Sequence, residues 1–372
     1  MKASLLYATK SRSTFEPAKL NIKHTRARLA LAFSLAVLYL LWHVAGLGRK
    51  SHTFPTFDQS TPPLPCRSLP GANETLVVFR TGSTELESRL PTHLSTSMRC
   101  FPNYLIFSDV EETYHGEHIY DALSDISPAI LSTHPDFELH RRLRRFGAGR
   151  TALNSTELAD TSPDKFASKT GKQSNPGWKL DKWKFLPMLN KTLHLHPSMK
   201  WYVFTEADGY ILGSTLHQYL ATLDHTQPIY AGNPTQIGPD IFAHGGSGFV
   251  VSQPAMWKLV NYYTAHKTAI EEITNSYWAG DCVLGKTFAD AGVPLTWAWP
   301  SFQSDYPGLV DYSGAEARNP EGQRLRVWCT TPVSYHHMSG AQVEEMWNYE
   351  QDWVVRHNPV IIENILQSKE CS

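Results

Sequence analysis

The sequence is poor in cysteine and in net charge. Its five cysteines show no spacing typical of a zinc site, so we expect no cysteine-held metal cluster. The formal net charge is −1, which argues against a nucleic-acid partner. No internal repeat is visible. Hydrophobic residues make up 41% of the chain, enough to build a core, which excludes a fully disordered or fibrous protein.

The low net charge is the sum of two unlike parts. Residues 1–50 carry nine basic residues against one acidic residue, a net charge of +8. Residues 51–372 carry 25 basic and 34 acidic residues, a net charge of −9. A basic end followed by an acidic body indicates that the two parts face different surroundings.

One long apolar run accounts for this split. Residues 29–47 contain no Asp, Glu, Lys or Arg, and a helix of this length just spans a bilayer core about 30 Å thick. Most of the basic residues of the N-terminal part precede the run, so the positive-inside rule places the N-terminus in the cytosol. A cleaved signal peptide is the alternative, but the run is longer than the roughly 7–15 residues of such a peptide's apolar core. We therefore expect a retained anchor.

The predicted organisation follows from this anchor. It consists of a basic cytosolic tail at 1–28, the transmembrane signal anchor at 29–47, a proline-rich stem at 48–74 and a lumenal domain at 75–372. Within the domain, residues 138–177 combine an arginine cluster with Gly, Ser, Thr, Asp and Lys, and we interpret them as a mobile surface insertion.

All five cysteines lie beyond the anchor, in a compartment that would be oxidising. We expect two disulfides, Cys66–Cys100 and Cys282–Cys329, with Cys371 left over, although spacing alone does not fix the connectivity. Sequons beyond the anchor predict N-glycosylation at Asn73, Asn154 and Asn190.

The lumenal domain begins with a strand-helix-strand pattern. Residues 76–80 and 103–108 are short apolar runs typical of strands, and residues 85–98 between them are helix-like. Such a unit implies parallel pairing. A further strongly apolar strand is predicted at 200–205, preceded by a helix with an apolar stripe. The sequence thus predicts an α/β fold with a mostly parallel central sheet flanked by helices.

Two carboxylates follow that apolar strand directly. Glu206 and Asp208 are two residues apart, so in extended chain they project to the same side while Ala207 faces the fold. At the carboxyl end of a parallel strand they suit a divalent cation such as Mg²⁺ or Mn²⁺. An ordinary acidic turn is the alternative interpretation.

Three further residues are candidates for chemistry. Asp281 precedes a helical pattern and is either an N-cap or a general base that deprotonates a hydroxyl. His336 could complete a metal site held by carboxylates. Trp299 could stack on a sugar ring in a substrate cleft, although core packing is the commoner role of tryptophan.

Four motifs in order carry a family resemblance. They are Glu-Ala-Asp-Gly-Tyr at 206–210, Gly-Gly-Ser-Gly-Phe-Val-Val-Ser at 245–252, Gly-Asp-Cys-Val-Leu-Gly at 280–285 and Ser-Tyr-His at 334–336. The sequence resembles the inverting β-1,3-glycosyltransferases of the Fringe and core 1 β-1,3-galactosyltransferase family (family 31 type), most of all its fungal members. The family shows Asp-Asp-Asp-Thr-Tyr, Gly-Gly-Ala-Gly-Tyr-Val-Leu-Ser, Glu-Asp-Val-x-x-Gly and Ser-Phe-His. The similarity covers about residues 75–337.

The resemblance implies a role for each matching residue. The metal, Mn²⁺ or else Mg²⁺, would be held by Glu206, Asp208 and His336, and Asp281 would be the catalytic base. The donor nucleotide would lie beside Thr81, Gly82, Lys184 and Ala207. The cleft for acceptor and donor would be formed by Gly245, Gly246 and Ser247, with Trp299 beside them.

Two positions depart from the family pattern. Glu206 stands where the family has Asp and is one methylene longer, which bears on metal coordination. Gly280 stands where much of the family has an acid before the base. Both departures bear on donor choice and activity.

The resemblance implies a Golgi enzyme of type II topology with a nucleotide-diphospho-sugar transferase (GT-A-like) fold. It would transfer galactose from a UDP-sugar in a β-1,3 linkage, with UDP-N-acetylglucosamine as the other donor considered. The acceptor would be a glycan on glycoprotein, as for an N-acetylgalactosamine 3-β-galactosyltransferase-like activity. The alternative is an inactive transferase-like chaperone or glycan-binding protein of the secretory pathway. A glycoside hydrolase with paired carboxylates is a third interpretation. The oligomeric state stays open, with a homodimer among the alternatives.

Overall fold

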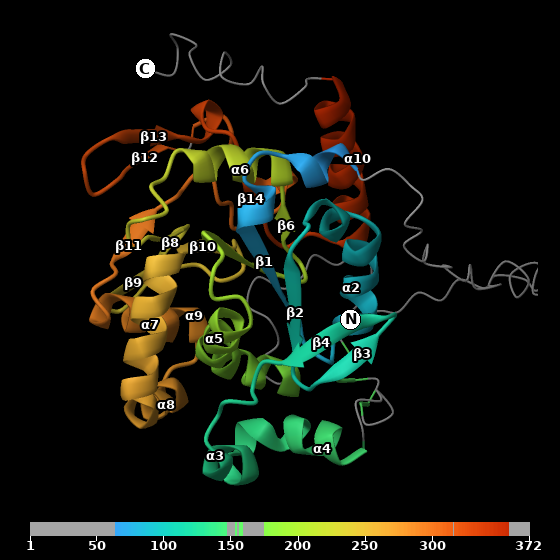
Figure 1. Ribbon diagram of the computed structural model, residues 1–372, viewed down its shortest axis with the longest axis vertical. Coiled ribbons are helices and arrows are strands. Elements are labelled where there is room, and N and C mark those ends of the chain that lie inside the picture. The colour runs from blue at the N-terminus through green and yellow to red at the C-terminus, as the bar shows by residue number, and fades with distance from the viewer. Residues whose placement is uncertain (1–63, 147–152, 155, 159–174, 315, 357–372) are drawn as a thin grey trace, which may run out of the picture. The chain divides into compact units, whose positions relative to one another are not determined.

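The computed structural model describes residues 64–146, 153–154, 156–158, 175–314 and 316–356 (Figure 1). The strands in this part of the chain are β1 (Thr75–Arg80), β2 (Tyr104–Ser108), β3 (Glu112–Tyr114), β4 (Glu117–Asp121), β5 (Trp201–Glu206), β6 (Tyr210–Ile211), β7 (Tyr230–Gly232), β8 (Pro234–Ile237), β9 (Asp240–Ala243), β10 (Phe249–Ser252), β11 (Leu295–Trp297), β12 (Glu316–Arg318), β13 (Arg324–Arg326) and β14 (Ser334–Tyr335). The α-helices are α2 (Leu86–Ser95), α3 (Pro128–Thr133), α4 (Glu138–Phe146), α5 (Pro176–Leu195), α6 (Gly213–Ala221), α7 (Gln253–Ala265), α8 (Lys267–Ser276), α9 (Gly280–Asp290) and α10 (Gly340–Arg356).

The central sheet is mixed but mostly parallel. Among the described residues it has eight strands in the order β11-β7-β10-β5-β1-β2-β4-β3. Four of its pairings are parallel, those of β1 with β2 and β5, of β2 with β4 and of β7 with β11. Strand β10 runs antiparallel to both of its neighbours, and β3 runs antiparallel to β4. The predicted mixed α/β fold with a large, mostly parallel sheet is confirmed.

The central strands are buried on both faces. All six residues of β1 are buried, and so are the first five of β5. Near-continuous apolar runs of this kind are typical of parallel strands covered on both sides. Because side chains alternate along a strand, Tyr202 and Phe204 of β5 enter one core cluster, whereas Trp201 and Val203 enter another.

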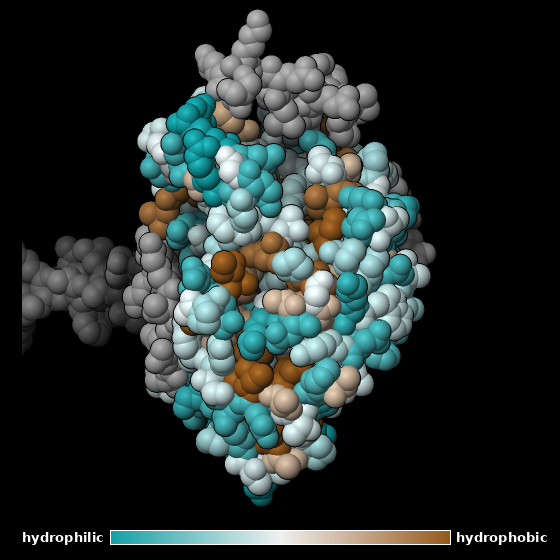
Figure 2. All heavy atoms as spheres, turned by 90° about the vertical axis from the view of Figure 1, so that its left-hand side faces the viewer, coloured by the Kyte–Doolittle hydropathy of each residue, from teal (hydrophilic) through white to brown (hydrophobic). Residues whose placement is uncertain are grey.

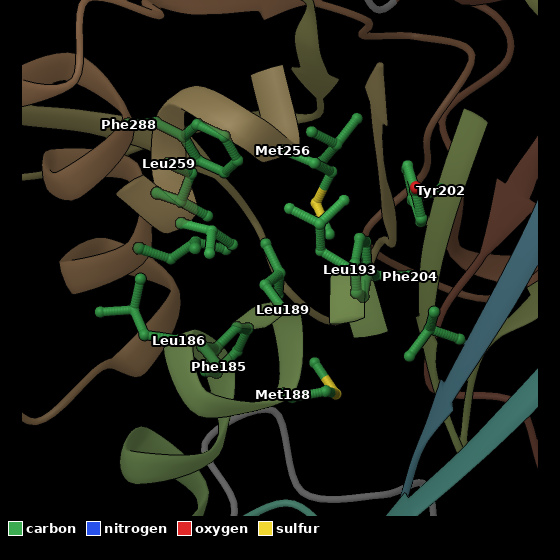
Figure 3. Close-up of a cluster of buried hydrophobic side chains, with 14 of the residues drawn as sticks. Phe185, Leu186, Met188, Leu189, Leu193, Tyr202, Phe204, Met256, Leu259 and Phe288 are labelled. Carbon is green, nitrogen blue, oxygen red and sulfur yellow. The ribbon is translucent and has the colours of Figure 1, made fainter. Parts of the chain in front are cut away.

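Helices cover both faces of the sheet. In the larger cluster, Leu189 and Leu193 of α5 pack with Met256 of α7, Phe288 of α9 and the sheet residue Phe204 (Figure 3). The other face is covered partly by α6, through Leu216 and Leu220. The apolar stripe predicted before β5 is the buried side of α5. On the outer face that α7 and α8 help to form, apolar residues lie in separate small groups among hydrophilic ones (Figure 2).

The structure differs from the predicted organisation at two boundaries. The last part of the predicted stem forms two short 3₁₀ turns, Pro65–Ser68 and Ala72–Glu74, and buries Cys66 and Ala72 in the body. The start of the predicted insertion 138–177 is helix α4, because its leucines pack inward instead of facing solvent. Most of the remaining insertion lies outside the described residues.

The described part of the chain contains no helix that is long and apolar enough to span a bilayer. The predicted tail at 1–28, the anchor at 29–47 and the first part of the stem lie outside the described residues.

One of the two predicted disulfides is present. Cys66 and Cys100 are bonded, with their Cα atoms 5.1 Å apart. The predicted Cys282–Cys329 pair is wrong, because Cys282 is a free thiol while Cys329 belongs to another disulfide. Cys282 lies in the first turn of α9 and packs inward against Phe242 and Ala279. The expectation for Cys371 falls outside the described residues.

The predicted sequons differ in their surroundings. The side chains of Asn73 and Asn154 are exposed. Asn190 lies within α5, is half-buried, and donates a hydrogen bond from Nδ2 to Oδ2 of Asp125 at 2.9 Å. That nitrogen is the atom to which a glycan would be attached.

Two leucines of α5 provide a matched test of this packing. Leu189 is fully buried in the larger core cluster, whereas Leu195 at the end of the same helix is 41% exposed. We expect Leu189→Ala to lower the free energy of unfolding by about 2–5 kcal/mol, because it removes buried methyl groups and leaves a cavity. Leu195→Ala should change it by less than about 0.5 kcal/mol. Denaturant titration measures both, and equal effects would contradict the described packing of α5.

Candidate active site

Charged side chains gather where strands β1 and β5 end. The parallel register sets Arg80, the last residue of β1, beside Glu206, the last residue of β5. Asp208 lies within the tight turn that follows β5, in which the Gly209 N–H donates to the Glu206 carbonyl at 3.0 Å. Open α/β sheets bind ligands at the carboxyl ends of their strands, so the acidic motif lies at a position suited to binding.

The two carboxylates of this motif have different partners. Ala207 between them is 3% exposed and packs into the fold, as its position in the motif predicts. The Glu206 carboxylate forms an ion pair with the guanidinium of Arg80. The same guanidinium binds Asp181 of α5, with Nη1 2.6 Å from Oδ1. Glu206 is therefore engaged by a buried arginine.

Asp208 faces two histidines. Strand β14 pairs with β6 and carries His336 to Asp208, where Nε2 lies 3.1 Å from Oδ1. Nδ1 of His337 is 3.8 Å from Oδ2 of the same carboxylate. One ligand atom from each of these three residues lies within 4.8 Å of the others. The structure thus groups Asp208 and His336 with His337, whereas the sequence predicted Glu206 as the third ligand.

An unusual backbone conformation brings the two histidines together. In extended chain, consecutive side chains point to opposite sides. His337 has φ of 56°, in the left-handed region that residues other than glycine rarely adopt. As a result its ring stacks on the His336 ring, with centroids 3.9 Å apart. The Met338 N–H fixes the turn by donating to the Asp208 carbonyl at 2.8 Å.

The electrostatics of this trio fit a bound cation. Burial by itself would raise the pKa of Asp208, but His336 and Arg89 outweigh it and hold this pKa well below its usual range. Within the described structure, Nδ1 of His337, the atom that faces Asp208, is buried and makes no hydrogen bond of normal length. A carboxylate with two imidazoles is a donor set that suits Fe²⁺ or Zn²⁺ better than Mg²⁺, and its carboxylate also suits Mn²⁺. The residues present therefore fit a divalent transition metal.

Asp281 is a second functional candidate. It lies in the first turn of α9, but the N-cap position of that helix is Ala279, so Asp281 is not the cap. Its Oδ2 accepts a hydrogen bond from the Gly245 N–H, and its Oδ1 accepts one from the Cys282 N–H, both at 2.9 Å. Burial raises the pKa of Asp281 to about 6 despite these bonds. A carboxylate with a pKa near neutrality can act as a general base.

The glycine-rich loop connects the two candidates. A side chain on Gly246 would collide with the His336 ring, since an added Cβ would lie 2.7 Å from its Nδ1. The N–H of Gly245 holds Asp281, and Ser247 accepts a hydrogen bond at its carbonyl from the Ser334 hydroxyl. The loop thus positions both the histidine strand and the candidate base.

The residues expected to contact the donor have mainly structural contacts. Lys184 is 2% exposed, and its Nζ lies 2.9 Å from the Thr81 carbonyl and 2.8 Å from Oδ1 of Asp109. It positions the loop that contains Gly82. Trp299 is half-buried beyond β11, and no hydrogen bond or ring contact among the described residues joins it to the site.

Part of the chain is similar to a known protein family. The model of the Fringe-like family matches residues 181–360. The predicted resemblance to this family is confirmed over that segment. No curated protein matches the chain in sequence. The Fringe-like segment contains Asp208, Asp281, His336 and His337, and the family suggests a glycosyltransferase.

The fold explains one departure of the Fringe-like segment from the motif. At Gly280 an added Cβ would lie 2.6 Å from the Lys182 carbonyl oxygen and 2.6 Å from Cδ2 of Phe185, so α9 and α5 are too close for a side chain. An acid therefore has no room at this position. Asp181, in the same turn of α5, directs its carboxylate to Arg80 instead.

Sequence reasoning missed three participants in the site. His337 could have been found, because it directly follows His336 and is also an imidazole. Arg89 and Asp181 could not have been found, because they come from helices that only the tertiary fold places beside the acidic motif.

Gly280→Ala tests the close approach of α9 to α5. We expect it to lower the free energy of unfolding by at least about 1–3 kcal/mol, as overpacking does, because the new methyl group meets backbone atoms. Gly314→Ala is the control, since an added Cβ there would lie 3.7 Å from its nearest neighbour. Thermal and denaturant unfolding would measure both variants, and a neutral Gly280→Ala would show that the helices are further apart.

Proposed function

We propose that this protein is an inverting glycosyltransferase with a GT-A-like fold and a UDP-linked sugar donor. The sugar proposed is galactose, transferred in a β-1,3 linkage to a glycan on glycoprotein. The observation that carries the proposal is the pairing of a carboxylate of pKa about 6, Asp281, with the Asp208–His336–His337 trio, one on each side of the glycine-rich loop. The Fringe-like segment contains both groups.

The proposed reaction is a single displacement. Asp281 accepts the proton of the acceptor hydroxyl, and the N–H groups of Gly245 and Cys282 orient its carboxylate for this step. The acceptor oxygen forms a bond to the anomeric carbon from the face opposite the diphosphate. The bond between that carbon and the diphosphate oxygen breaks, and the configuration inverts. A metal held by Asp208, His336 and His337 would supply positive charge to the departing UDP.

The proposed location is the Golgi membrane, with a type II anchor and a lumenal catalytic domain. The apolar run at 29–47 and its basic flank support this topology. The Cys66–Cys100 disulfide supports an oxidising compartment.

Asp281→Asn tests the base. We expect this variant to lose transfer by about 100-fold or more, since general-base catalysis contributes about 10²–10⁴-fold, while Mn²⁺-dependent UDP binding stays near the parent value. Asp290→Asn, an exposed position at the other end of α9, is the control and should transfer like the parent. Substantial turnover by Asp281→Asn would overturn the base assignment.

The pH dependence of transfer gives a second test of Asp281. The base acts only when unprotonated, and its pKa is raised to about 6. Transfer should therefore be close to maximal above this pKa and fall about tenfold for each pH unit below it. UDP release measured from pH 5 to pH 8 would show this fall in rate at acidic pH, and a rate that does not change with pH would contradict the assignment of Asp281.

If no donor gives UDP release and no metal-dependent thermal shift occurs, the inactive chaperone or glycan-binding alternative is favoured.

His337→Ala tests the ligand set. We expect Mn²⁺ affinity to fall by at least about 10-fold, as outer-shell changes alone often cause 10- to 100-fold losses. Glu206→Gln should change it much less, because Arg80 already engages that carboxylate. His115→Ala is the matched control, since His115 is exposed and also left-handed, with φ of 50°. Calorimetry with Mn²⁺ alone measures the affinity of all three variants. A larger loss in Glu206→Gln than in His337→Ala would support Glu206 as the ligand.

A further inference from the structure

Three cations lie around the acidic motif, and they differ in how firmly they are held. Lys184 and Arg80 have side chains that are 3% and 5% exposed, and each lies within 2.8 Å of a carboxylate oxygen. Arg89 of α2 is 19% exposed, and its closest carboxylate contacts are 3.3 Å to Glu85 and 3.8 Å to Asp208. Arg89 is thus the one of these three whose charge is most available to a ligand.

Arg89 also lies beside the candidate metal site, where a molecule bound to the metal could contact it. Its Nη1 approaches Oδ2 of Asp208, the same oxygen that faces Nδ1 of His337. Arg89 and a cation therefore share one carboxylate. A cation bound there would take over the charge of Asp208, and the guanidinium would then keep only its contact with Glu85, on the side away from that carboxylate's new partner.

We propose that Arg89 binds the diphosphate of the nucleoside-diphosphate donor and acts with the metal to neutralise it. A guanidinium presents its donors in a planar fork that matches two phosphate oxygens, which an ammonium group does not. Arginine beside a metal is a common arrangement for stabilising charge on a phosphoryl leaving group. This inference rests on the proposed function and names the residue that recognises the phosphate part of its donor.

The proposal predicts effects of opposite sign for two ligands. Without nucleotide, Arg89 competes with the metal for Asp208, so Arg89→Gln should bind Mn²⁺ more tightly, by about 2- to 10-fold. With Mn²⁺ present, the same variant should bind UDP at least 10-fold more weakly, while its affinity for uridine, which has no phosphate, stays unchanged. A merely structural role would weaken the binding of Mn²⁺, UDP and uridine together.

The experiment is calorimetry on the full chain with Mn²⁺ alone, with UDP in the presence of Mn²⁺, and with uridine. Arg144→Gln is the control, because it removes the same charge from an exposed position of α4 and should match the parent in all three titrations. Arg89→Lys keeps the charge without the fork and should lie between parent and Arg89→Gln for UDP. It replaces Arg89→Gln as the deciding variant if the latter does not fold.

The role of Arg89 would be overturned if Arg89→Gln bound UDP as tightly as the parent. If Arg89→Gln does not fold, the same result with Arg89→Lys would overturn it. Either result would leave the proposed function intact. If the parent itself binds no UDP with Mn²⁺, the proposed function fails, and this inference fails with it. Loss of uridine binding in parallel with UDP binding would show that Arg89 only supports the fold.

Discussion

The guanidinium of Arg80 joins three of the elements that form the site, β1, α5 and β5. Arg80 is the last residue of β1, and its guanidinium forms ion pairs with Asp181 of α5 and Glu206 of β5. The guanidinium carbon also lies 3.9 Å from the centroid of the Phe185 ring. The side chain of Arg80 is only 5% exposed, and a buried charge of this kind is tolerated only where opposite charges and a polarisable surface surround it. The relative positions of the sheet and α5 at the site therefore depend on this contact.

This contact divides the acidic motif into two roles. Because Glu206 neutralises Arg80, its carboxylate is committed to the wall of the site. Asp208 is left to face the histidines, and the left-handed residue His337 supplies a second imidazole. The longer side chain of Glu206 suits this arrangement, since its extra methylene reaches across to the neighbouring strand. In this motif one carboxylate is paired with a buried arginine and the other faces two imidazoles.

The absence of an acid before the base has a related cause. Gly280 lets α9 approach the backbone of α5, and this approach places Asp281 where the Gly245 N–H can reach it. Phe185 lies beside both Gly280 and Gly245 and beside the Arg80 guanidinium. One aromatic ring of α5 therefore sets the spacing between the base, the glycine-rich loop and the arginine.

Much of the fold and part of the site follow from local sequence pattern. The strand-helix-strand start, the buried strand before Glu206 and the helix with the apolar stripe are encoded in runs of neighbouring residues, so they could be predicted. The order of the four motifs also identified the family that residues 181–360 match. The partner of Cys66 was predicted correctly, whereas that of Cys329 was not, because the inward face of α9 buries Cys282.

The sequence by itself determined the residue types of the site and their order along the chain. Only the tertiary structure decided which of them meet. The spacing of the acidic motif suggested Glu206 as a metal ligand. Spacing shows on which side of a strand a side chain projects, but not which residues it contacts there. Arg80, Asp181 and Arg89 come from a neighbouring strand and two helices, and their charges act over a few ångströms. The electrostatics of the site were therefore fixed by packing, which brings together residues such as Arg80 and Glu206 that are 126 positions apart.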